Sequence, residues 1–228
     1  MRLTHAVLVL ADISGYTDFI TNREVSLLHA EQIITDLLES MIDRTEHPLI
    51  LNKLEGDAAL LHGECATDDF VAARDVLAQV KAFFPAFAAR LALQKEQRAH
   101  CVCDACTRIE QLALKAFVHH GEFAIKQVRQ FEELAGEAVI LVHRLLKNRV
   151  AAREYVLLTE PARAAAGVDV ALLQEHREDC EGVGAVPLWL VAPGDLPFDL
   201  APRGDAGDQA IATADAVERS GVFHHIPR

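Results

Sequence analysis

The feature that most constrains the fold of this chain is a buried strand near its start that ends in a polar turn. Residues 7–11 form a continuous run of Val, Leu and Ala, which is typical of a β-strand buried on both faces. The run ends at Asp12 and is followed by Ile13, Ser14 and Gly15. Over residues 27–42 apolar side chains then recur at spacings of three and four, which predicts an amphipathic helix. Backbone N–H groups of a glycine turn that opens a helix can bind an anion.

The rest of the chain alternates between strand and helix patterns. Residues 49–51 and 58–62 predict two strands of a hairpin, with a tight turn at 55–57. A second helix carries the apolar residues from 70 onwards, and we expect Pro85 to kink or end it. The remaining predicted elements are strands at 115–120 and 123–128 with a turn at 121–122 between them, a helix at 138–146, a strand at 155–158, a helix at 161–166 and a strand at 186–191.

This order of elements predicts an α+β fold, with a mostly antiparallel sheet and flanking helices, and a ferredoxin-like arrangement fits it. The length of 228 residues corresponds to one domain with an extension. We place the domain at residues 1–192. From residue 193 the composition shifts to Pro, Gly, Asp and Ala, which predicts a loose C-terminal extension over residues 193–228.

The charge of the chain limits its partners. Lys and Arg total 22 and Asp and Glu total 34, which gives a net charge of −12. Because nucleic acids and anionic membranes attract a positive surface, we expect neither as a partner. The apolar runs are shorter than the roughly 20 residues of a membrane span, and the N-terminus does not resemble a secretory signal. Five cysteines, an odd number, then favour a reducing cytoplasm.

Two carboxylates are candidates for metal binding. Asp12 ends the first buried strand, and Asp57 lies in the turn of the predicted hairpin. If these strands are neighbours, both side chains reach the same end of the sheet. Paired carboxylates suit Mg²⁺ or Mn²⁺, which complete their coordination with phosphate oxygens and water. Taken separately, each residue has a simpler interpretation, as a helix cap and as a turn residue.

The motifs around these carboxylates resemble the class III nucleotidyl cyclase catalytic domain. Residues 12–17 (Asp-Ile-Ser-Gly-Tyr-Thr) are similar to its opening motif, and Lys53 with Asp57 matches its second signature of a Lys, three residues and an Asp. The resemblance continues at residues 120–122 and in the helix at 135–144, so it covers roughly residues 5 to 192. Together with the cysteine segment described below, the chain resembles a bacterial branch of cyclase-like proteins without a settled function.

The resemblance implies a metal and nucleotide site in a homodimer. Asp12, Asp57 and the Ile13 carbonyl would hold two Mg²⁺ or Mn²⁺ ions that bind a nucleoside triphosphate and activate its ribose 3′-hydroxyl. Lys53 would contact the base, and Arg144 would stabilise negative charge in the transition state. In this family the site is shared between two chains, so Lys53 and Arg144 would face the carboxylates of the partner. The residues implied in nucleotide contacts are Ser14, Gly15, Tyr16, Thr17, Lys53 and Glu133.

Two departures from the family pattern concern the nucleoside. The family has an Asn that orients the ribose where this chain has Ile140, and a base-specifying Asp where it has Glu133. The resemblance therefore implies metal-dependent nucleotide binding, with weak or altered conversion of a nucleoside triphosphate to a cyclic monophosphate and pyrophosphate. The alternative is a catalytically inactive cyclase-like module that senses a ligand or binds a partner.

A cysteine cluster is the second candidate site. His100, Cys101, Cys103 and Cys106 could offer four ligands to Zn²⁺, whereas Cys65 and Cys180 are distant in the sequence. The cluster falls in a segment near residues 95–112, where a cyclase domain needs only a short connection, so we interpret it as an insertion. Loop cysteines without a metal, and a redox-sensing or dimer-bridging thiol cluster, are the alternative interpretations.

Overall fold

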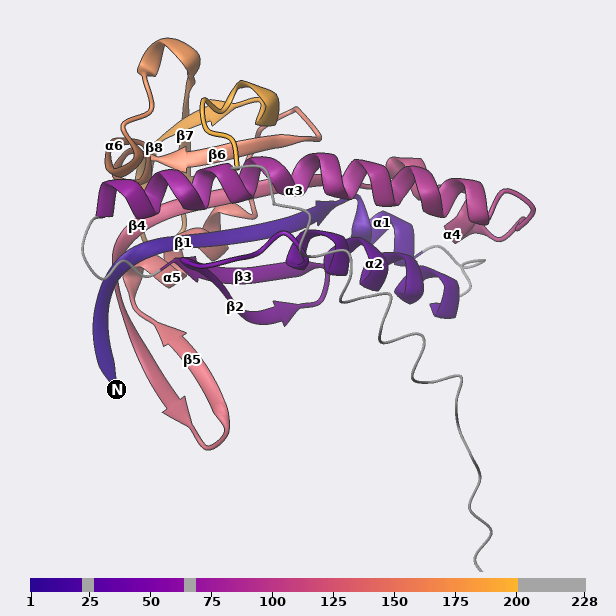
Figure 1. Ribbon diagram of the computed structural model, residues 1–228, viewed down its shortest axis with the longest axis horizontal. Helices are drawn as coiled ribbons and strands as arrows, with labels where there is room; N and C mark the ends of the chain where they lie inside the picture. The colour runs from indigo at the N-terminus through magenta and orange to yellow at the C-terminus, as the bar shows by residue number, and fades with distance from the viewer. Residues whose placement is uncertain (22–26, 64–68, 201–228) are drawn as a thin grey trace, which may run out of the picture.

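An interior strand of the sheet, β1 (Arg2–Ser14), is the strand that the apolar run at 7–11 predicts. It pairs antiparallel with β3 (Ala58–Gly63) on one side and β4 (Ala113–Val128) on the other. This computed structural model describes residues 1–21, 27–63 and 69–200 (Figure 1). Packing layers on both faces of β1 bury its alternate side chains, which explains why its sequence is continuously apolar.

The eight-stranded sheet is almost wholly antiparallel. Only the pairing of β4 with β6 is parallel among the strand pairs of the described residues. A hairpin of β4 and β5 (Phe131–Ala135) projects from the body of the molecule (Figure 1). The prediction of an α+β fold with a mostly antiparallel sheet is confirmed. The strand order is β2 (Leu49–Glu55), β3, β1, β4, β6 (Tyr155–Thr159), β8 (Gly184–Val191) and β7 (Gln174–Cys180), with β5 paired to β4.

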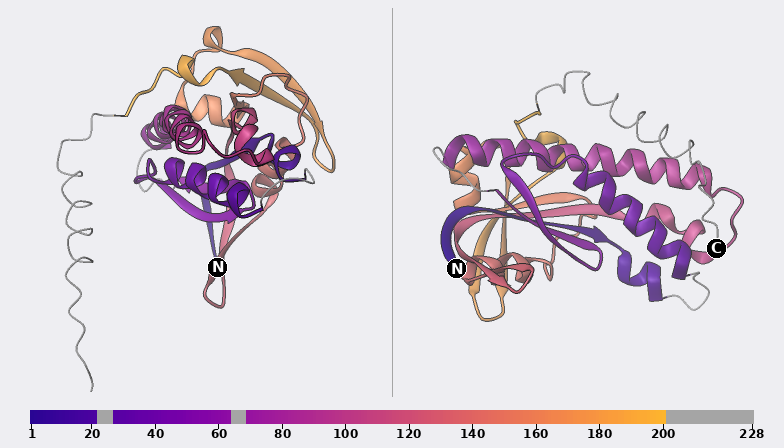
Figure 2. Two further views of the ribbon diagram at one scale, coloured as in Figure 1. Left: turned by 90° about the vertical axis from the view of Figure 1, so that its right-hand side faces the viewer. Right: turned by 60° about the horizontal axis from the view of Figure 1, so that its bottom comes forward.

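Helices cover both faces of the sheet. Along β1, Val7 and Val9 pack with the first set of helices and Leu8 with the helix on the opposite face, as the two-residue period of a strand requires. The first set consists of α2 (Leu27–Ile42), α3 (Asp69–Gln97) and α6 (Glu160–Ala166), and α5 (Glu137–Leu145) packs on the other face (Figure 2). The short elements are α1 (Tyr16–Thr21), α4 (Asp104–Thr107) and the 3₁₀ turns η1 (Ile109–Gln111), η2 (Val170–Leu172) and η3 (Pro193–Asp195).

Pro85 does not end the second helix, as one of the two expected outcomes had it. Helix α3 runs through this proline as one element of 29 residues. Pro85 is exposed, whereas Phe83, Phe84 and Phe87 are buried in the core beneath it. A carbonyl that loses its helical partner on the exposed face can bond to water, and the buried phenylalanines hold the helix on the sheet.

The expected turn at 121–122 is also absent, because β4 continues through it to Val128. Gly121 is a strand residue that pairs with Ala6 of β1. A Cβ at Gly121 would lie 2.6 Å from Nε2 of His119, so this glycine accommodates a buried histidine rather than a turn. The chain reverses instead after Val128, where Arg129 has a φ of +57°.

Helix α3 bears on the expectation that no segment spans a membrane, and the C-terminal segment bears on the predicted domain boundary at residue 192. By length and composition alone α3 could cross a membrane, yet in this fold it lies along the sheet and contributes to the core. Leu196 is buried in the same core, and Lys81 donates a hydrogen bond to its carbonyl at 2.8 Å. Packing thus continues past residue 192, while residues 201–228 of the expected extension lie outside the described residues.

Candidate nucleotide and metal site

Asp12 and Asp57 lie side by side at one end of the sheet. Asp12 is the Cα partner of Ala58, the first residue after the β2–β3 turn that carries Asp57. The Ile13 amide donates a hydrogen bond to the Asp57 carbonyl oxygen at 3.1 Å, which fixes the turn against the end of β1. Gly56 has a φ of +68°, a value that favours glycine in this tight turn. Antiparallel pairing of β1 and β3 therefore brings the two carboxylates together.

The electrostatic environment of this pair favours a cation. Asp12 is 8% exposed and forms an ion pair with Lys115, with Oδ2 and Nζ 2.9 Å apart. Burial, and then the negative charge of Asp12, raise the pKa of Asp57 to about 6, although Lys115 acts in the opposite direction. One lysine thus leaves the pair under-neutralised, and a carboxylate with so raised a pKa is a common mark of a binding or catalytic site.

The turn that follows Asp12 is shaped by a close backbone approach. Gly15 has a φ of +89°, and a Cβ there would lie 2.8 Å from the carbonyl oxygen of Gln111 in η1. Ser14 is half-buried at the end of β1, and Thr17 is exposed in the first turn of α1. The Tyr16 hydroxyl donates to Oε1 of Glu31 at 3.3 Å. The candidate residues 14–17 thus form the connection between β1 and the helical layer.

Lys53 and Glu133, the candidate base-contacting residues, form an ion pair across two strands. Their Nζ and Oε2 atoms lie 2.7 Å apart, and both side chains are about one-third exposed. Lys53 also lies 3.7 Å from Glu55, which is itself 2.7 Å from Nε2 of His143 on α5. The hydrogen bond from Lys53 and its charge lower the pKa of the Glu133 carboxyl. The structure therefore joins β2, β5 and α5 through a chain of polar side chains.

Arg144 and Ile140 line an open hollow on the surface of α5. The hollow has a volume of about 270 Å³ and is also lined by Val139 and His143. Arg144 lies 3.4 Å from the exposed Glu181, and Ile140 is 53% exposed. The class III cyclase resemblance implies an Asn that orients the ribose at position 140. This chain has an exposed isoleucine there instead.

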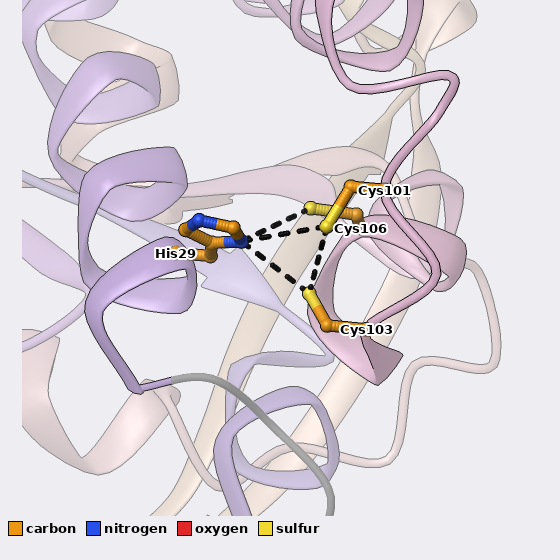
Figure 3. Close-up of side chains that lie close together, drawn as sticks. All are labelled: His29, Cys101, Cys103 and Cys106. Carbon is orange, nitrogen blue, oxygen red and sulfur yellow. Dashed lines mark hydrogen bonds between the residues drawn. The ribbon is translucent and has the colours of Figure 1, made fainter.

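The cysteine cluster is completed by His29 of α2 and not by the neighbouring His100. The imidazole of His29 and the thiols of Cys101, Cys103 and Cys106 have their ligand atoms within 4.8 Å of one another (Figure 3). His100 is exposed and does not belong to this group of described residues, which corrects the expected ligand set. Cys180 is buried in β7, and Cys65 lies outside the described residues.

Comparisons of the sequence define the family. A family model described as a protein of unknown function, DUF2652, matches residues 34–155. A relative from Mycobacterium tuberculosis (strain ATCC 25618 / H37Rv), named Uncharacterized protein Rv2561/Rv2562, is 34% identical over 171 residues, which cover 72% of this chain and 76% of the relative. The chain belongs to the DUF2652 family.

Solved structures show which fold this DUF2652 protein has. The guanylyl cyclase Cya2 matches with a TM-score of 0.68 at 17% identity over 89% of this chain and 96% of that chain. The adenylyl cyclase CyaB from P. aeruginosa matches with 0.62 at 14% identity over 91% and 100%. A class III adenylyl cyclase-like ATP-binding protein from Pseudomonas aeruginosa matches with 0.59 at 12% identity over 72% and 35%. The DUF2652 protein thus has the fold of class III cyclase domains.

Three residues that contact the candidate sites in this DUF2652 protein carry no local signal in the sequence. Lys115 opposes Asp12 from the neighbouring strand, and its position depends on the β1–β4 register. His143 reaches Glu55 from another element. His29 lies more than 70 residues before the cysteines, and no local spacing links it to them. Of these three residues, only His143 lies in a segment that the cyclase resemblance includes, the helix at 135–144.

Proposed function

We propose that this protein binds a nucleoside triphosphate together with Mg²⁺ or Mn²⁺ at the end of β1, in a homodimeric site of the cyclase type. The observation that carries the proposal is the adjacent pair Asp12 and Asp57, whose negative charge Lys115 only partly balances. Carboxylate oxygens are the ligands that both cations prefer. The donor set therefore fits the metals that the cyclase resemblance implies.

In this proposal each part of the site has its own task. Asp12, Asp57 and the Ile13 carbonyl hold the cations, and bound cations would supply charge neutralisation for the triphosphate and acidify the ribose hydroxyl. Lys53 and Glu133, already paired at 2.7 Å, contact the base of the nucleotide. The remaining contacts come from the turn residues Ser14, Gly15, Tyr16 and Thr17.

Arg144 is proposed to face the triphosphate bound to the partner chain. The Arg144 side chain is 40% exposed, and that of its ion-pair partner Glu181 is 87% exposed. Such a surface ion pair contributes little, about 0–1 kcal/mol. The arginine can therefore exchange this partner for a phosphate oxygen at small cost.

The same geometry supports a second candidate, nucleotide binding without efficient turnover. Ile140 offers no hydrogen bond at the position that orients the ribose in the family, and orientation supplies a large part of the rate in such transfers. An inactive sensor or partner-binding module would keep the pair Asp12 and Asp57. It would lack the side chain that orients the ribose by a hydrogen bond. Either function fits a cytoplasmic protein.

Calorimetric titration of the full chain with ATP, GTP, CTP and UTP, each with Mn²⁺, tests the proposal, followed by analysis of the products. We expect micromolar to millimolar affinity for at least one nucleotide that depends on Mn²⁺ and is lost in Asp57→Asn. The matched control is Glu39→Gln, which removes an exposed carboxylate of α2. Binding that is unchanged in Asp57→Asn, or no binding of any nucleotide, would overturn the proposal. Cyclic product distinguishes the enzyme from the binding module.

A further inference from the structure

A second group of metal-ligating side chains lies outside the carboxylate site and comes from two segments far apart in the sequence. His29 is in the first turns of α2, while Cys101, Cys103 and Cys106 lie between α3 and η1. Figure 3 shows the imidazole directed at the three sulfurs from the opposite side. Four side chains that converge in this way form a built site rather than a chance proximity of neighbours in a loop.

The distances between the ligand atoms match a tetrahedral zinc ion. Nδ1 of His29 lies 3.6 Å from the sulfur of Cys101, 3.5 Å from that of Cys103 and 3.7 Å from that of Cys106. The sulfurs of Cys101 and Cys103 are 3.5 Å apart. Zn–S bonds of about 2.3 Å and a Zn–N bond of about 2.0 Å at tetrahedral angles place nitrogen and sulfur about 3.5 Å apart and two sulfurs about 3.8 Å apart.

A disulfide and an iron–sulfur cluster both fit these distances less well than zinc does. A disulfide between Cys101 and Cys103 requires sulfurs about 2.05 Å apart, far below the 3.5 Å observed. An iron–sulfur cluster requires room for several atoms between its ligands, but all four ligand atoms lie within 4.8 Å of one another. Three thiols and an imidazole are soft and borderline ligands, which select zinc over Mg²⁺ or Mn²⁺.

We propose that His29 Nδ1 and the thiolates of Cys101, Cys103 and Cys106 bind one structural Zn²⁺ ion. Four protein ligands close the coordination sphere, which is the arrangement of structural rather than catalytic zinc. On binding, the cysteines release their thiol protons to solvent, and no bond is oxidised or reduced. The site is separate from the proposed nucleotide site in both ligand chemistry and residues.

The ion would fasten the insertion to the helical layer. Cys106 and Ala105 are buried in the core beside α2, but α4 has only four residues and little apolar surface of its own. The same segment continues into η1, whose Gln111 carbonyl abuts Gly15. Because the free energy of zinc binding adds directly to folding, the ion would hold this short segment where its own packing is insufficient.

Metal analysis of the full chain, purified without chelator, tests the proposal. We expect about one zinc per chain in the wild type and in the controls His100→Ala and Cys180→Ser, and less than about one-fifth of that in His29→Ala and Cys103→Ser. Loss of the zinc should also lower the unfolding temperature by at least about 5 °C. Retention of zinc by His29→Ala together with its loss from His100→Ala would overturn the proposed ligand set.

Cobalt substitution keeps the test decisive if a variant fails to fold. Wild-type protein reconstituted with Co²⁺ should show the visible bands of a tetrahedral ion and thiolate-to-cobalt charge transfer, and stoichiometric Zn²⁺ should remove both. Modification of three thiols should release one equivalent of zinc to a chromophoric chelator. Metal-free wild-type protein whose three thiols react freely, octahedral cobalt bands, or the brown absorption of an iron–sulfur cluster would each overturn the proposal.

Discussion

Replacement of Asp57 by Asn should stabilise the protein in the absence of divalent cations and remove its response to them. Burial and the charge of Asp12 raise the Asp57 pKa from 3.8 to about 6. This rise in the pKa of Asp57 corresponds to about 3 kcal/mol, which solvent screening of the half-buried side chain reduces to about 1–2 kcal/mol. Asn is nearly isosteric and carries no charge, so the native state of the variant avoids this cost.

The sign of the pH dependence follows from the raised pKa. Between about pH 4 and pH 6 the native state binds a proton at Asp57 that the unfolded state has lost, so the wild type loses stability as the pH rises through this window. The advantage of Asp57→Asn should therefore be complete above about pH 7 and vanish near pH 4. For a chain of this size it amounts to about 3–6 °C in unfolding temperature at pH 8.

Thermal unfolding at pH 8 and pH 4, with and without millimolar Mn²⁺, measures both effects. Mn²⁺ should raise the unfolding temperature of the wild type and leave Asp57→Asn unchanged, because only the pair of carboxylates gains from a cation. The control Glu39→Gln should behave as the wild type in every condition. A variant that is less stable than the wild type at pH 8 without Mn²⁺ would refute this account of the carboxylate pair.

Three further predictions concern different parts of the molecule. Gly15→Ala should lower the free energy of unfolding by about 1–3 kcal/mol in denaturant titrations, because its Cβ would meet the Gln111 carbonyl at 2.8 Å, whereas Gly182→Ala, with a similar φ of +78° and open space, should cost less. Burial, with the charges of two neighbouring histidines, lowers the pKa of His119 to about 4. Proton uptake by the unfolded state at His119 should therefore cost the wild type about 2 kcal/mol between pH 7 and pH 5 that His119→Gln does not lose. The difference in free energy of unfolding between the two proteins, measured in urea at both pH values, should change by that amount, because the opposite contribution of Asp57 is common to both. Ile140→Asn should increase cyclic nucleotide formation without loss of stability, since Ile140 is 53% exposed, and an unchanged rate with nucleotide still bound would contradict the role given to this position.

Elements whose patterns are local could be predicted from the amino-acid sequence. The run at 7–11, the helix at 27–42 and the hairpin turn at 55–57 each carry their signal within a few residues, and the structure contains all three. The motif around Asp12 and Asp57 also indicates the cyclase fold. Edge strand β7 has a mostly charged sequence, so it lacks the apolar signal that identifies a buried strand.

The partners of the site residues, in contrast, depend on how distant segments pack. The ion pair of Asp12 with Lys115 depends on the β1–β4 register, and the pairing of Lys53 with Glu133 depends on the hairpin that sequence patterns missed. His29 shows the limit most clearly, because a helical histidine has no local signal of a partner 72 residues away. Local spacing favoured His100, but the packing of α2 beside the insertion brings His29 to the thiols. Contacts between distant segments arise from packing of the whole core, and no short stretch of sequence encodes them.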